Sequence, residues 1–178
     1  MYDNGNFFNG DSKMKKVLLA LLGALVFIGC SSKGAEELAP SKLAVGASLE
    51  SLTLNDQFEK PHAVTKETRK IVFAFSKQVG HDCNDFFATK ESDYLSSKNT
   101  LFVADVSGAP SVIRSMFIMP GLKDFAHTIL VIDDKNVAAT YKPEGDLEKV
   151  VVVSLDSFVI TSIDYLQTPQ ELDTFLTK

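Results

Sequence analysis

Cys83, His81 and His127 are the side chains of this sequence best suited to chemistry. A cysteine thiolate is a strong nucleophile, and a neighbouring imidazole can take up the thiol proton. Cys83 follows the predicted start of a helix, where the helix dipole lowers the pKa of a thiol. The three residues therefore allow a single-thiol enzyme of the peroxidase or thiol-exchange type that uses Cys83.

Two carboxylates oppose the activation of Cys83. Asp82 and Asp85 lie beside the cysteine, and negative charge disfavours a thiolate. Cys83 also shares a helical spacing with Phe86 and Phe87, as expected of a small apolar side chain on a buried helix face. We predict that Cys83 packs in the core, and the single-thiol enzyme stands as the alternative.

A metal site would need the same residues to converge. His81, Asp82 and His127 could meet at one end of a sheet and offer nitrogen and oxygen ligands. The adjacent pair His81-Asp82 does not have the spacing of a recognised ligand motif. We therefore predict no metal and no cofactor, and we expect the histidines in caps or loops.

Buried strands and helices alternate around these residues. Apolar runs at residues 71–75 and 101–106 are typical of strands that are buried on both faces. Between them, Asp82 predicts the N-cap of a helix that ends near Ser97. After the second strand, Pro110 predicts the start of another helix.

The second half of the chain predicts a third strand, a hairpin and a last helix. Residues 128–132 are apolar, and residues 150–153 and 158–166 indicate two strands joined by a tight turn. Residues 136–145 fit either a short strand or an irregular crossing. Residues 168–171 (TPQE) form a capping box before the apolar spacing of the C-terminal helix.

The helix predicted after Pro110 has one strongly apolar face. This face contains Val112, Ile113, Met116, Phe117 and Met119. We expect these side chains to pack in the core. The alternative is that residues 116–119 (MFIM) are exposed and form a partner surface. Arg114 is expected on the solvated face of the helix.

This order of elements resembles the thioredoxin-like fold, over about residues 45–176. Val45-Gly46, followed by residues 52–57 (LTLNDQ), is similar to the opening segment of peroxiredoxins and of related periplasmic thioredoxin-like proteins. The resemblance implies an α/β protein, with a thioredoxin-like three-layer α/β/α sandwich and a mixed central sheet.

The residues that carry thioredoxin chemistry are missing from the matching positions. Thioredoxins have a CxxC motif at the start of the helix after the central strand, but here Cys83 is alone and Gly80 stands three residues before it. His127 takes the place of the family's cis-proline. The Pro and Thr that precede the peroxiredoxin cysteine are also absent. We therefore predict a domain without dithiol oxidoreductase activity.

Residues 107–128 resemble stretches of small, uncharacterised exported bacterial proteins, some of which carry a flavin dehydrogenase label. A dinucleotide-binding protein needs a glycine-rich turn between a strand and a helix. This sequence has no such turn, and its predicted domain is small for a flavin enzyme. We therefore do not expect a flavin.

The N-terminal segment has the three-part order of an export signal. A lysine-rich start at residues 13–16 precedes an apolar stretch at residues 17–28, which is followed by Gly29 and Cys30. As a helix this stretch spans roughly 18 Å, less than the ~30 Å hydrocarbon core of a bilayer. A permanent transmembrane helix is therefore not expected.

Residues 27–30 (FIGC) resemble the lipobox of bacterial lipoproteins. The resemblance implies cleavage before Cys30 and acylation of Cys30 with palmitate and further acyl chains, which together make a stable anchor. In two-membrane bacteria, Ser31 then implies transport to the outer membrane. An ordinary secretory signal is the alternative. Residues 1–13 are predicted to precede the true start at Met14. The further predicted boundaries are a signal peptide at 14–29, a lipidated flexible tether at 30–42 and one thioredoxin-like domain at 43–178.

Charge and cysteine count narrow the function further. The chain has a net charge of −5 and no basic run, which makes nucleic acid an unsuitable partner. With Cys30 used for the anchor, Cys83 has no disulfide partner within the chain. The leading hypothesis is a periplasm-facing lipoprotein, attached to the membrane through Cys30, that binds or scaffolds an envelope protein.

Overall fold

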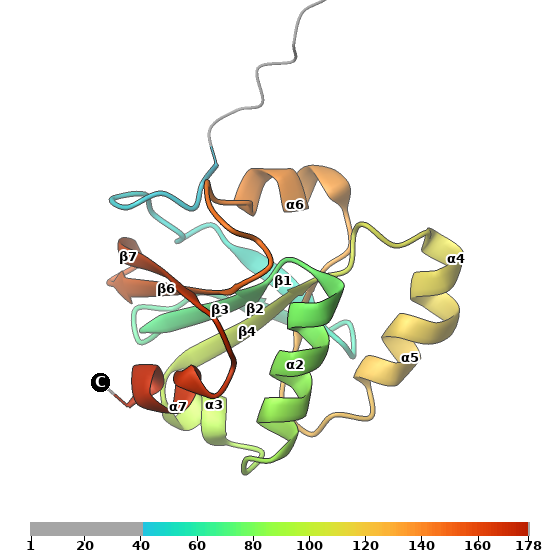
Figure 1. Cartoon of the computed structure of the whole chain (residues 1–178). Helices are drawn as coiled ribbons and strands as arrows, with labels where there is room; N and C mark the ends of the chain where they lie inside the picture. The colour runs from blue at the N-terminus through green and yellow to red at the C-terminus, as the bar shows by residue number, and fades with distance from the viewer. Residues whose placement is uncertain (1–40, 178) are drawn as a thin grey trace, which may run out of the picture. The chain divides into compact units, whose positions relative to one another are not determined.

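A seven-stranded mixed sheet runs through the part of the chain that the structure describes, residues 41–177 (Figure 1). The structure is a computed structural model. The described residues do not include the segment predicted to precede the true start (1–13), the signal peptide, Cys30 or the tether up to residue 40. Within residues 41–177, no helix has the length and apolar character needed to cross a membrane.

The strand order in the sheet is β2-β1-β5-β4-β3-β6-β7. The strands are β1 (Thr53–Asp56), β2 (Pro61–Ala63), β3 (Lys70–Ala74), β4 (Thr100–Asp105), β5 (Leu130–Ile132), β6 (Val150–Asp156) and β7 (Val159–Leu166). β3, β4 and β5 are parallel, whereas β6 pairs antiparallel with β3, and β7 antiparallel with β6. The strands predicted at residues 71–75, 101–106, 128–132 and in the C-terminal hairpin are confirmed.

Helices connect the parallel strands and close the chain. They are α2 (Lys77–Ala88), α3 (Tyr94–Ser97), α4 (Ser111–Ile113), the π-helical turn η1 (Arg114–Ile118), α5 (Met119–Leu122), α6 (Lys135–Tyr141) and α7 (Glu171–Leu176). Residues 136–145 were expected to form a strand or an irregular crossing, but residues 136–141 lie in helix α6. The Asp134 carboxylate caps this helix by accepting from the backbone N–H groups of Asn136 and Val137.

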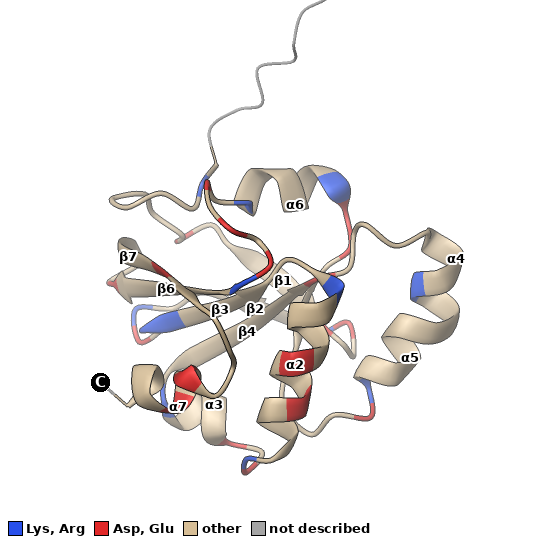
Figure 2. Cartoon of the chain, viewed as in Figure 1, with Lys and Arg blue, Asp and Glu red and all other residues tan. Residues whose placement is uncertain are grey.

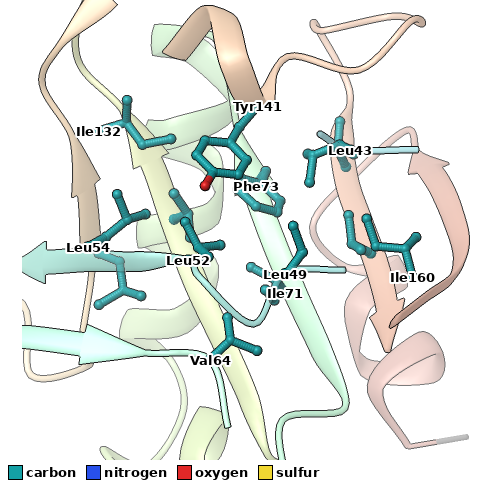
Figure 3. Close-up of a cluster of buried hydrophobic side chains, with 14 of the residues drawn as sticks. Leu43, Leu49, Leu52, Leu54, Val64, Ile71, Phe73, Ile132, Tyr141 and Ile160 are labelled. Carbon is teal, nitrogen blue, oxygen red and sulfur yellow. The ribbon is translucent and has the colours of Figure 1, made fainter. Parts of the chain in front are cut away.

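Two apolar cores lie on opposite faces of the sheet. The α6-side core places residues 43–54 and Tyr141 of α6 against strand residues such as Ile71 and Phe73 (Figure 3). The α2-side core joins α2, α3, α5 and α7 to the other face of the same strands. The three layers predicted from the sequence are confirmed, although an extended segment and a single short helix cover the α6 side.

The connectivity is that of the thioredoxin-like fold. A β3-α2-β4 unit is followed by the antiparallel strands β6 and β7 and by the C-terminal helix α7. Only half of the predicted capping box forms: the Glu171 carboxylate accepts from the backbone N–H of Thr168 at 3.1 Å, but the Thr168 hydroxyl donates to the same carboxylate and does not cap the helix. The helix itself begins at Glu171, after a turn at residues 169–170.

Candidate functional site

Helix α2 begins earlier than the sequence predicted. Ser76 is its N-cap, and its hydroxyl accepts from the backbone N–H of Val79 at 3.4 Å. The prediction that Asp82 caps this helix is wrong, as is the prediction of one helix to Ser97, because α2 ends at Ala88 and α3 follows separately. Asp82 lies on the exposed side of α2, where it accepts from Gln78 Nε2 at 2.8 Å.

Cys83 is therefore not near the positive end of the helix dipole. It lies almost two turns into α2, and its residue is 0% exposed. Its neighbours in the α2-side core include Val72 and Phe102. Burial, with a smaller contribution from Asp82, raises the pKa of the Cys83 thiol to about 12. The thiol is protonated at neutral pH, which fits the packing interpretation.

His81 is on the same helix as Cys83 but is not placed to accept the proton of its thiol. His81 is exposed, whereas Cys83 is buried, and residues two apart on a helix do not face each other. Among the described residues, neither His81 nor His127 forms a hydrogen bond with the Cys83 sulfur. The proton transfer that a Cys/His enzyme needs therefore has no acceptor at this thiol.

His127 instead belongs to a buried polar network between α2 and β1. Its Nε2 lies 3.0 Å from Asn84 Oδ1. Because an amide oxygen only accepts, we assign the proton to Nε2 of the imidazole. The His127 carbonyl accepts from Gln57 Nε2 at 2.8 Å, and Gln57 Oε1 accepts from the Ile129 N–H at 2.9 Å. All three side chains are 5% exposed or less.

Aromatic rings enclose the His127 imidazole. The ring centroids of Phe87, Phe102 and Phe125 lie 5.4, 6.1 and 5.3 Å from it. Burial lowers the pKa of His127 to about 4, so the imidazole is neutral at physiological pH. His127 therefore holds β5 and α2 together as a neutral hydrogen-bond donor. Gln57 and Asn84, which complete the network, had no signal in the sequence beyond a polar turn and a polar helix position.

The predicted equivalence of His127 with the cis-proline position is wrong. His127 precedes β5, which pairs parallel with β4. The strand that pairs antiparallel with the central strand β3 is β6, which Lys149 precedes. Residues 41–177 contain no cis peptide bond. The position that corresponds to the cis-proline of thioredoxins is therefore in the turn before β6 and is not His127.

The structure does not bring the candidate metal ligands together. Asp82 and His81 point to the exposed side of α2, and His127 is buried beneath it. The part of the chain that the structure describes contains no group of three His, Cys, Asp or Glu side chains close enough to hold a metal ion.

A hollow of about 710 Å³ lies between α2 and α7. Lys90 Nζ and Asp173 Oδ2 lie 2.5 Å apart at its edge, and the Tyr94 hydroxyl donates to Asp173 Oδ1 at 2.7 Å. Burial and the Asp173 carboxylate raise the pKa of Tyr94. These groups are paired with one another, which makes the hollow a structural contact between α2, α3 and α7.

The helical segment α4–η1–α5 has exposed apolar side chains. Val112, Ile113, Met116 and Phe117, which we call the apolar strip, are 60%, 42%, 63% and 64% exposed. The prediction that they pack in the core is wrong. Only the end of the segment is packed, since Ile118 and Met119 contact the α2-side core and Leu122 is 8% exposed.

A π-helical turn accounts for this change of face. Pro120 has no backbone N–H, and in an α-helix its ring would clash with the carbonyl of Met116. The chain widens here, so that the Met119 N–H donates to the Arg114 carbonyl, five residues back. The extra residue in the turn rotates Met116 and Phe117 away from the side of the segment on which Met119 and Leu122 contact the core.

Arg114 was predicted to lie on a solvated helix face, but its side chain is bonded to the backbone at the start of this segment. Its Nη1 donates to the carbonyl of Ala109 at 2.6 Å and to that of Ser107 at 3.4 Å. Figure 2 shows a basic position on the helical segment labelled α4 and α5, and acidic positions on α2. Residues 106–123 contain two basic and no acidic side chains, unlike the chain as a whole.

Comparisons with known proteins find solved structures of low sequence identity. No family model and no curated protein matches the sequence. Similar solved structures include the peroxidoxin BcpB from Mycobacterium tuberculosis, with 15% identity, 75% of this chain and 94% of that chain covered, and a TM-score of 0.45. A peroxiredoxin-like protein from Aquifex aeolicus has 11% identity, 79% and 87% coverage and a TM-score of 0.47. A thio-disulfide isomerase from Thermus thermophilus has 18% identity, 76% and 96% coverage and a TM-score of 0.47.

Proposed function

We propose that this chain is a periplasm-facing, lipid-anchored thioredoxin-like module that acts by binding and not by thiol chemistry. The observation that carries the proposal is the position of Cys83, which is fully buried almost two turns into α2. The first turn of that helix, where thioredoxins have their dithiol, reads Ser76-Lys77-Gln78-Val79. This turn has no sulfur nucleophile.

The apolar strip supports a role in binding. Large apolar side chains of a helix are normally covered in the folded protein, and a contiguous exposed group of them often marks an interaction site. Here four neighbouring apolar side chains lie on one short segment, and the π-helical turn keeps two of them, Met116 and Phe117, facing outwards. The segment therefore offers the binding surface of the proposed module.

The proposed anchor depends on the N-terminal sequence. The apolar stretch at residues 17–28 and the lipobox-like residues 27–30 support acylation of Cys30, and Ser31 supports the outer membrane as the destination. Radioactive palmitate fed to cells that produce the protein should label it. Labelling should be lost in Cys30→Ala and kept in Cys83→Ala, which is the matched control. Equal labelling of both variants would refute the anchor.

The single-thiol enzyme is tested by oxidation of the folded protein. A peroxidase cysteine must form a sulfenic acid with hydrogen peroxide, and this step requires a thiolate that peroxide can reach. We expect Cys83 to stay unmodified when peroxide and a sulfenic-acid trap are added to the native chain. The trap should modify Cys83 only after denaturation. Rapid modification of the native chain would favour the enzyme.

A further inference from the structure

We infer that the apolar strip docks on the bilayer that holds the lipid anchor, with Met116 and Phe117 inserted into the region between the headgroups and the acyl chains. This inference rests on the proposed anchor and names the partner of the proposed binding surface. Four features of the chain support docking: the composition of the strip, the charge around it, the area that it offers and the length of chain between the anchor and the domain.

The composition of the segment suits a membrane surface. Side chains that insert at a bilayer interface are apolar and are flanked by cations that pair with anionic headgroups. Met116 and Phe117 are 63% and 64% exposed, and Arg114 and Lys123 are the charged residues between positions 106 and 123. Asp105 and Asp124 bound this stretch, and the buried Asp105 carboxylate is paired with Lys142 Nζ at 3.3 Å. The segment is therefore close to neutral in a chain of net charge −5, and it repels anionic lipid less than the rest of the chain does.

The size of the strip argues against a second copy as its partner. At the observed exposures, its four side chains amount to a patch on the order of 400 Å². A stable protein interface buries about 800 Å² on each partner. A bilayer needs no matching patch, because each inserted side chain leaves water independently and the anchor already holds the domain nearby.

The tether is long enough to allow docking and short enough to favour it. Residues 30 to 41 can span at most roughly 40 Å when fully extended. A domain of this length has a radius of gyration of about 14 Å, so any of its sides can be turned towards the membrane. Tether and domain together keep the strip within roughly 75 Å of the lipid surface, which gives it a high effective concentration there.

The experiment uses a fluorescent reporter in the strip, which is possible because the chain contains no tryptophan. Residues 41–177 contain both cores, so the chain can be produced from residue 30 onwards without the signal segment. It is coupled through Cys30 to a maleimide lipid in vesicles of phosphatidylethanolamine and phosphatidylglycerol. The buried Cys83 thiol does not compete for the maleimide.

Two variants are compared in these vesicles. Phe117→Trp reports on the strip, and Phe58→Trp is its matched control, since Phe58 is 59% exposed in the turn between β1 and β2. We expect the emission of Phe117→Trp to shift to shorter wavelength and to be quenched by brominated acyl chains. The emission of Phe58→Trp should do neither. Without coupling, Phe117→Ser should lower the vesicle partition coefficient about tenfold, and Phe58→Ser should change it by less than about twofold.

Three results would overturn the inference. The first is an unshifted emission of Phe117→Trp on coupled vesicles. The second is a shift that appears without lipid and grows with protein concentration, which would identify a second copy as the partner. The third is a shift that requires added envelope protein. Because the coupling is chemical, none of these results depends on acylation of Cys30 in cells, which palmitate labelling tests separately.

Discussion

Helix α2 and the segment α4–η1–α5 both follow a parallel strand and contribute to the core on the same face of the sheet. α2 buries all of its large apolar side chains, whereas the segment leaves the four of the apolar strip exposed. α2 packs directly on β3 and β4, whereas the contacts of α4 and α5 within residues 41–177 are mainly with η1 between them. In Figure 1 the segment lies to the right of α2. An apolar helix face is thus buried where the helix packs on a strand, as in α2, and exposed where it does not, as in the apolar strip.

The largest expected contrast between the two regions is in stability. Phe87 of α2 is 2% exposed and lies 5.0 Å from the Phe102 ring, centroid to centroid. Phe87→Ala should lower the free energy of unfolding by about 3–5 kcal/mol through the lost burial and the cavity. Phe117→Ala in the apolar strip should change it by less than about 0.5 kcal/mol. Urea denaturation measures both, and equal losses would show that the strip is packed after all.

The buried network beneath α2 should make stability depend on pH. His127 has a folded-state pKa of about 4 against an ordinary value of 6.5, so the unfolded chain binds more protons between these pH values. Stability should be fully present above pH 6.5 and should fall by about 3 kcal/mol as the pH drops towards 4. His127→Gln should flatten this part of the profile. An unchanged slope in that variant would assign the dependence to another group.

A smaller effect tests where α2 begins. Ser76→Ala removes the hydroxyl that caps the helix and should cost about 1 kcal/mol of stability. Asp82→Ala is the matched variant at the position that the sequence indicated as the cap, and it should cost less than about 0.5 kcal/mol because Asp82 is exposed. If Asp82→Ala proved the more damaging of the two, the helix would start where the sequence indicated.

The strands and the fold class were predictable from the sequence because their signals are local. Residues 71–75 and 150–153 are continuous apolar runs, which only a strand or helix buried on all sides can accommodate, and their short length favours strands. The start of α2 was not predictable in this way. Ser76 and Asp82 are both good capping residues, and Gly80 between them weakens the helical signal although the helix continues through it.

The candidate site could be predicted only in part, because its decisive contacts join distant residues. The burial of Cys83 follows from its spacing to Phe86 and Phe87. The neutral state of His127 depends on its enclosure and on its contact with Asn84, 43 residues away. The exposure of Met116 and Phe117 depends on the π-helical turn at Arg114, and a 3.6-residue periodicity does not represent such a turn.

The central claim, that Cys83 is a packing residue whereas the apolar strip is an accessible surface, can be tested on one protein. A chain from residue 30 with Cys30→Ser and Phe117→Cys carries one thiol in each region. Iodoacetamide labelling of this folded chain across pH should proceed at position 117 with a midpoint near ~8.5, the pKa of a free thiol. Position 83 should stay unlabelled until denaturant is added. Native labelling of Cys83 at a rate comparable to that at position 117, with a midpoint at or below ~8.5, would contradict the account.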